Sequence, residues 1–153
     1  MRESADIGSN IVLLRGACVW MVLTLGLAWC LVGLGYRVAA VEALFPGEFT
    51  RLLQAHIDFL LMSALLLGFY ATRIRLPALT AWAMVIGAFT NSSLFLLMAM
   101  FPVLDYATNP APHWAQPIYE TYLFASLSLT TYGFATAAMT VLKRSLARPE
   151  TAA

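Results

Sequence analysis

Four long apolar stretches, separated by shorter polar ones, dominate the chain. They cover residues 12–35, 53–72, 77–101 and 118–142, and each is near or above the ~20 residues that a helix needs to cross the hydrocarbon core of a bilayer. Residues 76–104 and 121–142 contain no charged side chain. Transmembrane strands would need segments of about 10 residues with alternating polarity, and no such alternation occurs. The pattern predicts an all-α, integral membrane four-helix bundle that forms a single domain over residues 1–153.

The composition agrees with a bilayer environment. Of the 153 residues, 61% are hydrophobic and 11% are charged, and the mean hydropathy is +0.77. A soluble domain typically has about 25% charged residues. The net charge of +1 is uninformative about nucleic acid, but the sequence has no basic stripe interleaved with aromatic residues, so we expect no nucleic-acid partner.

The distribution of basic residues predicts the orientation. If the N-terminus is inside, only Arg37 and Arg51 fall in outer loops. The inner side then receives Arg2, Arg15, Arg73, Arg75, Lys143, Arg144 and Arg148. Because cytoplasmic loops carry the excess of Lys and Arg, both termini are expected in the cytoplasm of a cell with a bacterial-type inner (plasma) membrane, which the chain would cross several times.

The first apolar stretch has an alternative interpretation as a cleaved signal peptide, with small residues near Ala39, Ala40 and Ala43. Its run from Gly16 to Gly35 is longer than the 7–15 apolar residues typical of such peptides, so a retained helix is favoured. Small residues in this stretch and in the fourth allow close helix contacts and favour a homo-oligomer.

His56 is the most informative single residue, because it lies near the start of the second apolar stretch. Ionisable side chains inside a membrane are costly and usually functional, and neutral imidazole is a common metal and haem ligand. The alternative is a histidine at the headgroup boundary that bonds to a loop. Asp58 lies about 200° further round the helix, so it should face a different neighbour, and we expect it to form an ion pair with Arg51 or Arg37.

Three further polar residues are candidates for a site. Asn91, near the middle of the third stretch, would either hydrogen-bond a neighbouring helix or orient a polar atom of a ligand. Glu120, at the outer start of the fourth, is a possible polar contact or a partner of the helix dipole, and Tyr122 is a phenolic donor or a packing residue. His113 lies in a proline-rich loop and is a poor second axial ligand, so a haem here would be five-coordinate, with one face open for ligand chemistry.

The segment Gln54-Ala-His-Ile-Asp-Phe-Leu-Leu-Met-Ser63 resembles the second-helix motif of the styrene oxide isomerases and hydroxylaminobenzene mutases, a family of four-helix membrane isomerases. Two other features carry the resemblance. One is the short basic-Leu-Pro connection that ends at Pro77, and the other is the Gly-x-x-x-Asn pattern from Gly87 to Asn91.

The resemblance implies a homotrimer that holds haem b between subunits, with His56 as the ligand of its iron. It also implies chemistry in which the iron acts as a Lewis acid on a substrate oxygen. The hypothesis is therefore a haem-dependent isomerase acting on a small hydrophobic substrate, converting an epoxide to an aldehyde or an arylhydroxylamine to an aminophenol. Its catalytic residues would be Asn91, which orients the substrate, and Tyr122 or Glu120 as a secondary polar contact.

The chain also departs from the family pattern. Met62 stands where the family usually has Asn, Phe95 stands where the epoxide isomerases have a pocket tyrosine, and Asp58 is closer to the mutase pattern. Two alternatives follow. One is a non-catalytic haem-binding membrane protein that serves as a sensor or electron carrier, and the other is an accessory membrane subunit without a cofactor.

Overall fold

The computed structural model describes residues 2–108 and 114–147, with side chains from Asn10 onward. These residues form helices and connecting segments and contain no strand. The helices are α1 (Arg2–Gly35), α2 (Ala39–Leu44), α3 (Phe49–Ala71), α4 (Ala78–Met100), the 3₁₀ helix η1 (Pro102–Leu104) and α5 (Gln116–Leu146).

The four predicted stretches correspond to α1, α3, α4 and α5. Among the described residues, three helices are long and apolar enough to cross a membrane: Asn10–Gly35, Phe49–Ala71 and Ala78–Met100. The fourth, α5, has 31 residues, but its many Ser and Thr side chains make it less apolar. The short helices α2 and η1 were not predicted.

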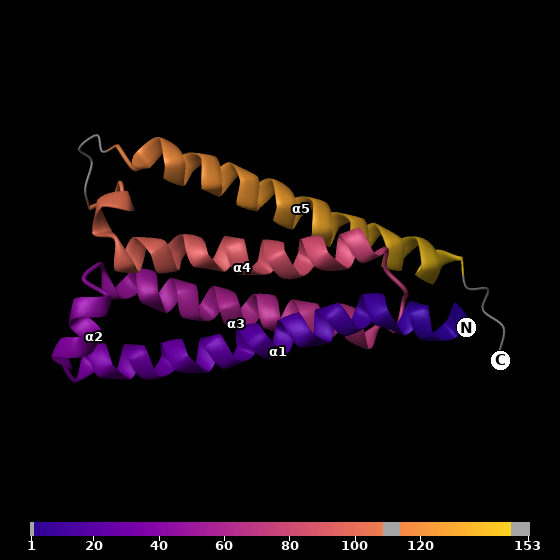
Figure 1. Ribbon diagram of the computed structural model, residues 1–153, viewed down its shortest axis with the longest axis horizontal. Helices are drawn as coiled ribbons and strands as arrows, with labels where there is room; N and C mark the ends of the chain where they lie inside the picture. The colour runs from indigo at the N-terminus through magenta and orange to yellow at the C-terminus, as the bar shows by residue number, and fades with distance from the viewer. Residues whose placement is uncertain (1, 109–113, 148–153) are drawn as a thin grey trace.

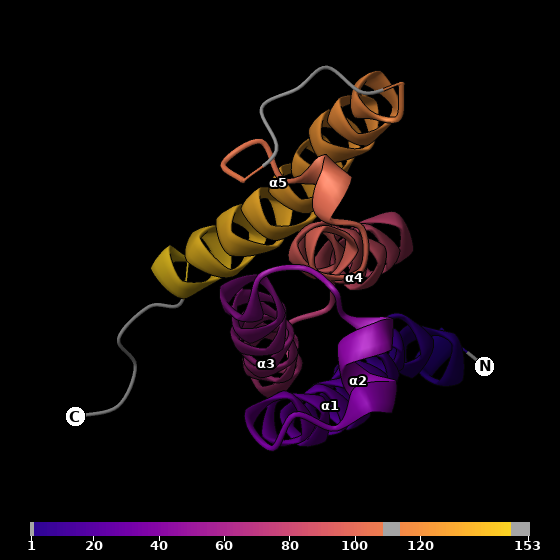
Figure 2. The same ribbon diagram turned by 90° about the vertical axis from the view of Figure 1, so that its left-hand side faces the viewer.

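The helix α4 occupies the centre of the arrangement. It packs against α1, α3 and α5, while α1 and α3 also pack against each other. Figure 2 shows α5 inclined to the other long helices, with α4 between it and the pair of α1 and α3. The fold is thus a group of three helices with a fourth laid across one side.

An aromatic cluster fills the junction of α1, α3 and α4. Trp20 stacks on Phe89 with ring centroids 4.7 Å apart, and Phe59 lies against both rings. The indole Nε1 of Trp20 donates a hydrogen bond to the carbonyl oxygen of Val85 over 3.2 Å. This bond satisfies the polar atom of Trp20 and connects α1 to α4 inside the core.

The contact between α4 and α5 depends on two glycines. A Cβ atom on Gly133 would lie 2.7 Å from the backbone nitrogen of Met84, and one on Gly87 would lie 2.8 Å from the Cα of Thr130. The backbones therefore approach closely, and Thr130 Oγ1 donates a hydrogen bond to the Gly87 carbonyl over 2.9 Å. Small residues that allow such approach are the usual basis of helix association in membranes.

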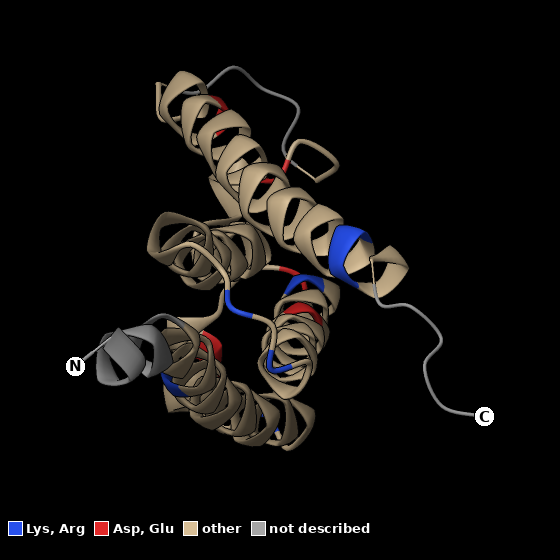
Figure 3. Cartoon of the chain, turned by 90° about the vertical axis from the view of Figure 1, so that its right-hand side faces the viewer, with Lys and Arg blue, Asp and Glu red and all other residues tan. Residues whose placement is uncertain are grey.

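The first turns of α1 and the last turns of α5 lie at the same end of the molecule (Figure 1), together with the connection between α3 and α4. We call this the terminal end. Asn10 joins α1 to the α3–α4 connection here. Its side-chain amide donates a hydrogen bond to the Ile74 carbonyl over 2.9 Å and accepts one from the Leu76 backbone nitrogen over 3.3 Å. Figure 3 shows Lys and Arg on the α3–α4 connection and on the last turns of α5 at this end.

A first prediction concerns the α4–α5 contact. Substituting Gly133→Val should lower stability by about 1–3 kcal/mol, because the added side chain has to displace backbone rather than a flexible side chain. The matched control is Gly68→Val, since nothing lies within 4 Å of a Cβ at Gly68. The measurement is the temperature at which half of the detergent-solubilised protein loses its size-exclusion peak. Equal losses in the two variants would contradict the close packing.

Candidate functional site

His56 lies half-buried on α3 and faces α1. Its Nδ1 is 3.0 Å from the carbonyl oxygen of Thr24. A carbonyl only accepts hydrogen bonds, so Nδ1 carries the proton and donates it. In the neutral ring, Nε2 then keeps its lone pair and is the nitrogen able to bind a metal.

Asn91 reaches α3 from the middle of α4. Its Nδ2 donates a hydrogen bond to Asp58 Oδ2 over 2.9 Å, and both residues are half-buried. The predicted ion pair of Asp58 is not formed, because Arg51 binds Asp105 and Arg37 binds Glu42. Asp58 lies two helical turns beyond Arg51 and turns toward α4 instead.

Tyr122 connects α5 to α4, with its hydroxyl 2.7 Å from Ser93 Oγ. Ser93 Oγ donates to the Thr90 carbonyl over 2.9 Å, so Tyr122 is the donor of the shared bond. Tyr122 also lines a pocket of about 550 Å³ between the end of α4, η1 and the start of α5. The other residues that line it are Leu97, Phe101, Val103, Leu104, Trp114, Ala115, Ile118 and Tyr119.

Gln116, which follows the pocket-lining Ala115 in the sequence, begins α5 and is 4% exposed. Neither atom of its side-chain amide has a hydrogen-bond partner within the described part of the chain. Glu120, one turn further on, is exposed and accepts a hydrogen bond from the Tyr106 hydroxyl over 3.0 Å. Glu120 therefore belongs to the surface of this end of the molecule.

The predicted site residues thus occupy three different helix interfaces and the surface. His56 faces α1, Asn91 binds Asp58 between α3 and α4, and Tyr122 binds Ser93 between α4 and α5. Within one chain, the structure joins none of the three predicted catalytic residues to His56. The rotation of about 200° between His56 and Asp58 already placed those two side chains on opposite sides of α3.

The other residues considered for the site are placed as follows. No group of three or more His, Cys, Asp or Glu that could hold a metal ion occurs among the residues searched, which are the described ones. His113 lies outside the described residues. Met62 and Phe95, two of the departures from the family pattern, are half-buried and pack against hydrophobic core clusters.

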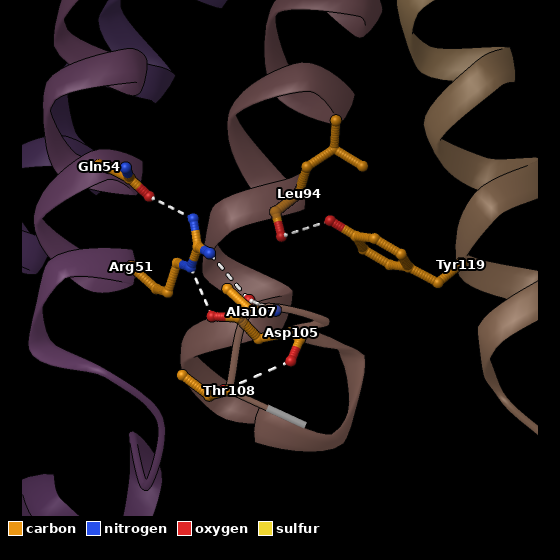
Figure 4. Close-up of polar contacts among 7 residues, drawn as sticks. All are labelled: Arg51, Gln54, Leu94, Asp105, Ala107, Thr108 and Tyr119. Carbon is orange, nitrogen blue, oxygen red and sulfur yellow. Dashed lines mark hydrogen bonds and ion pairs between the residues drawn. The ribbon is translucent and has the colours of Figure 1, made fainter. Parts of the chain in front are cut away.

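Sequence reasoning missed the ion pair of Arg51 and Asp105 (Figure 4). Arg51 Nε and Nη2 donate to Asp105 Oδ2 and Oδ1 over 2.6 and 2.8 Å, and the Ala107 backbone nitrogen donates to Oδ1 over 3.1 Å. The hydrogen bonds from Arg51 hold the pKa of Asp105 below its usual range. The pair fixes the start of α3 to the loop after η1.

Comparison with protein-family models, with curated proteins and with solved structures found no match to this chain. Its function therefore has to be inferred from its own residues, and from the resemblance carried by the segments around His56 and Asn91.

A second prediction concerns pH. Because the folded pKa of Asp105 lies below the value of about 3.9 for a free carboxyl group, the pair stabilises the fold fully above that value. This stabilisation is lost as the pH falls through the folded pKa. Asp105→Asn should therefore lower the unfolding temperature at pH 7. As the pH is lowered, the unfolding temperature of this variant should fall less steeply than that of the parent. The control is Glu120→Gln, at an exposed carboxylate, and an acid profile of Asp105→Asn that matches the parent would contradict the prediction.

A third prediction concerns Asn91 and Asp58. Removing either side chain leaves the other without its partner, at a cost of about 1 kcal/mol. The stability losses of Asn91→Ala and Asp58→Ala should consequently not add in the double variant. The control is Ser128→Ala, at an exposed position on α5. Its stability loss should add to that of Asn91→Ala when the two substitutions are combined. Additive losses for Asn91 and Asp58 would show that the two side chains do not interact.

Proposed function

We propose that the chain is an integral protein of a bacterial-type inner membrane, crossed by α1, α3, α4 and α5, with both termini in the cytoplasm. Three of these helices meet the length and hydropathy needed to span, and α5 has 22 residues without charge between Glu120 and Lys143. The beginning of α1 and the end of α5 share one end of the molecule, as an even number of crossings requires. Basic residues at that end support its placement inside.

In this setting, His56 is proposed to bind haem b through Nε2. The observation that carries the proposal is the hydrogen bond from Nδ1 to the Thr24 carbonyl. Metal-bound histidines almost always donate their other ring N–H in this way, which fixes the ring orientation and the tautomer. A single imidazole with its second nitrogen engaged suits a five-coordinate haem iron.

The surroundings of His56 suit a group held between subunits. Three apolar side chains close to His56 on α3 are exposed in the single chain: Leu53, Ile57 and Leu60. They provide an apolar surface for a flat macrocycle and for a neighbouring copy. This fits the homotrimer that the family resemblance implies.

The activity we propose is rearrangement of a small hydrophobic substrate, either an epoxide to an aldehyde or an arylhydroxylamine to an aminophenol. Haem iron would supply a Lewis acid for the substrate oxygen. The chain itself orients the imidazole through the bond from Nδ1 to the Thr24 carbonyl and places apolar side chains next to it on α3. Asn91, Tyr122 and Glu120 are proposed as polar contacts to the substrate. Within one chain each bonds to another residue and none to His56, so we propose that role for the oligomer.

Asn91 also favours a second candidate, a haem-binding membrane protein without isomerase activity. Its amide already donates to Asp58, and Met62 and Phe95 fill the core at positions where the resembled family has polar side chains. Such a protein would serve as a sensor or an electron carrier.

The fourth prediction tests the haem site. Protein purified in detergent after expression with added haem should show a Soret band, and His56→Ala should lose it. The chain has two histidines, so His113→Ala is the matched control and should keep the band. A parent protein without a Soret band would refute both candidates. The remaining hypothesis would then be that the chain is an accessory membrane subunit that binds no cofactor.

If the band is present, turnover separates the two candidates. The isomerase should convert aryl epoxides to aldehydes or arylhydroxylamines to aminophenols, with no added oxidant or reductant, and His56→Ala should be inactive. Reversible reduction and reoxidation of the haem without either product would favour the sensor or electron carrier.

A further inference from the structure

Two arginines at the terminal end, Arg73 and Arg144, differ in their partners from the arginines at the other end. At the end away from the termini, Arg37 pairs with Glu42 over 3.3 Å and Arg51 pairs with Asp105. At the terminal end, neither Arg73 nor Arg144 forms an ion pair with a described carboxylate. Neither positive charge is therefore paired by a carboxylate among the described side chains, which begin at Asn10.

Arg73 and Arg144 share one cleft. It has a volume of about 390 Å³ and lies where the α3–α4 connection meets the end of α5. The connection contributes Thr72, Arg73 and Ile74, and α5 and its C-cap contribute Arg144, Ser145 and Ala147. Arg73 and Arg144, more than 70 positions apart in the sequence, thus line the same cleft.

The hydrogen-bond donors of this cleft come from the guanidinium groups. Thr72 Oγ1 donates to the Phe69 carbonyl over 2.7 Å, and Ser145 Oγ donates to the Leu142 carbonyl over 2.8 Å, so neither hydroxyl has its proton free. Each guanidinium has five N–H donors in a fork that matches the oxygens of a phosphate. The cleft is therefore suited to an anion with several oxygens.

The backbone at Arg73 provides a second, independent observation. Its φ of 55° lies in the left-handed region, at the position after a helix end where glycine is usual. Arg37 has the same conformation, with φ of 57°, after the end of α1, and there the side chain binds Glu42. Arg73 adopts the same conformation, but no carboxylate among the described side chains pairs with it, so its guanidinium is available to an anion from outside them.

We propose that this cleft binds the phosphate group of an anionic phospholipid. Free phosphate offers the same oxygens, but the cleft lies where α3 ends and α4 begins, the depth at which phospholipid headgroups meet a spanning helix. Leu142 and Leu146 are exposed on the last turns of α5, with Leu146 77% exposed. These last turns of α5 therefore also present apolar surface on the helix that carries Arg144.

The test, and the fifth prediction, is native mass spectrometry of the full chain in detergent. The probes are dioleoylphosphatidylglycerol, dioleoylphosphatidylcholine with the same acyl chains, and inorganic phosphate. The parent should retain phosphatidylglycerol in preference to phosphatidylcholine, and Arg144→Gln should bind it about tenfold more weakly. Lys143→Gln removes the same charge from the neighbouring residue, which does not line the cleft, and should bind like the parent.

A second variant guards against a loss of folding. Arg73→Gly removes the guanidinium and relieves the left-handed backbone, so it should be at least as thermostable as the parent without lipid while binding phosphatidylglycerol more weakly. Equal weakening by Lys143→Gln would overturn the proposal, because it would show a general effect of charge. Equal retention of both lipids, or retention of inorganic phosphate alone, would overturn it as well.

Discussion

Polar side chains on apolar helices have to find partners on other helices, and this constraint organises the whole structure. A polar group left unpaired in an apolar setting is costly, and lipid offers no hydrogen bonds in place of water. Each packed pair of neighbouring long helices contains such a contact. These contacts are His56 with the Thr24 carbonyl between α3 and α1, Asn91 with Asp58 between α4 and α3, and Tyr122 with Ser93 between α5 and α4. Between α1 and α4, the contact is that of Trp20 with the Val85 carbonyl.

The central position of α4 follows from the same constraint. It has no charged side chain, it presents small and hydroxyl residues to its neighbours, and it contacts all three of the other long helices. In contrast, α5 depends mainly on α4, and large side chains such as Phe124 remain exposed on it. That exposed surface is available to lipid or to another copy of the chain, as the proposed homotrimer requires.

The two proposals rest on separate parts of the molecule. The haem proposal depends on the tautomer of His56 and on apolar surface around it, and its catalytic part needs neighbouring subunits. The phosphate cleft depends on Arg73 and Arg144 at the terminal end and is complete within one chain. Failure of one proposal would leave the other standing, since only the placement of the helices in a membrane is common to both.

The sequence by itself determined the four long helices to within a few residues at most of their ends, because apolar runs of this length have few other solutions. It also drew attention to His56, an ionisable residue in an apolar stretch. The rotation per residue of a helix predicted that Asp58 faces the opposite side of α3 from His56. It did not predict α2 or η1, which are too short to show a periodic pattern. Only the tertiary structure decided the partners: Arg51 meets Asp105 across 54 positions, and Asn91 meets Asp58 rather than His56. The reason is physical, because these contacts depend on how each helix is rotated about its axis and on how closely glycines such as Gly133 let two backbones approach.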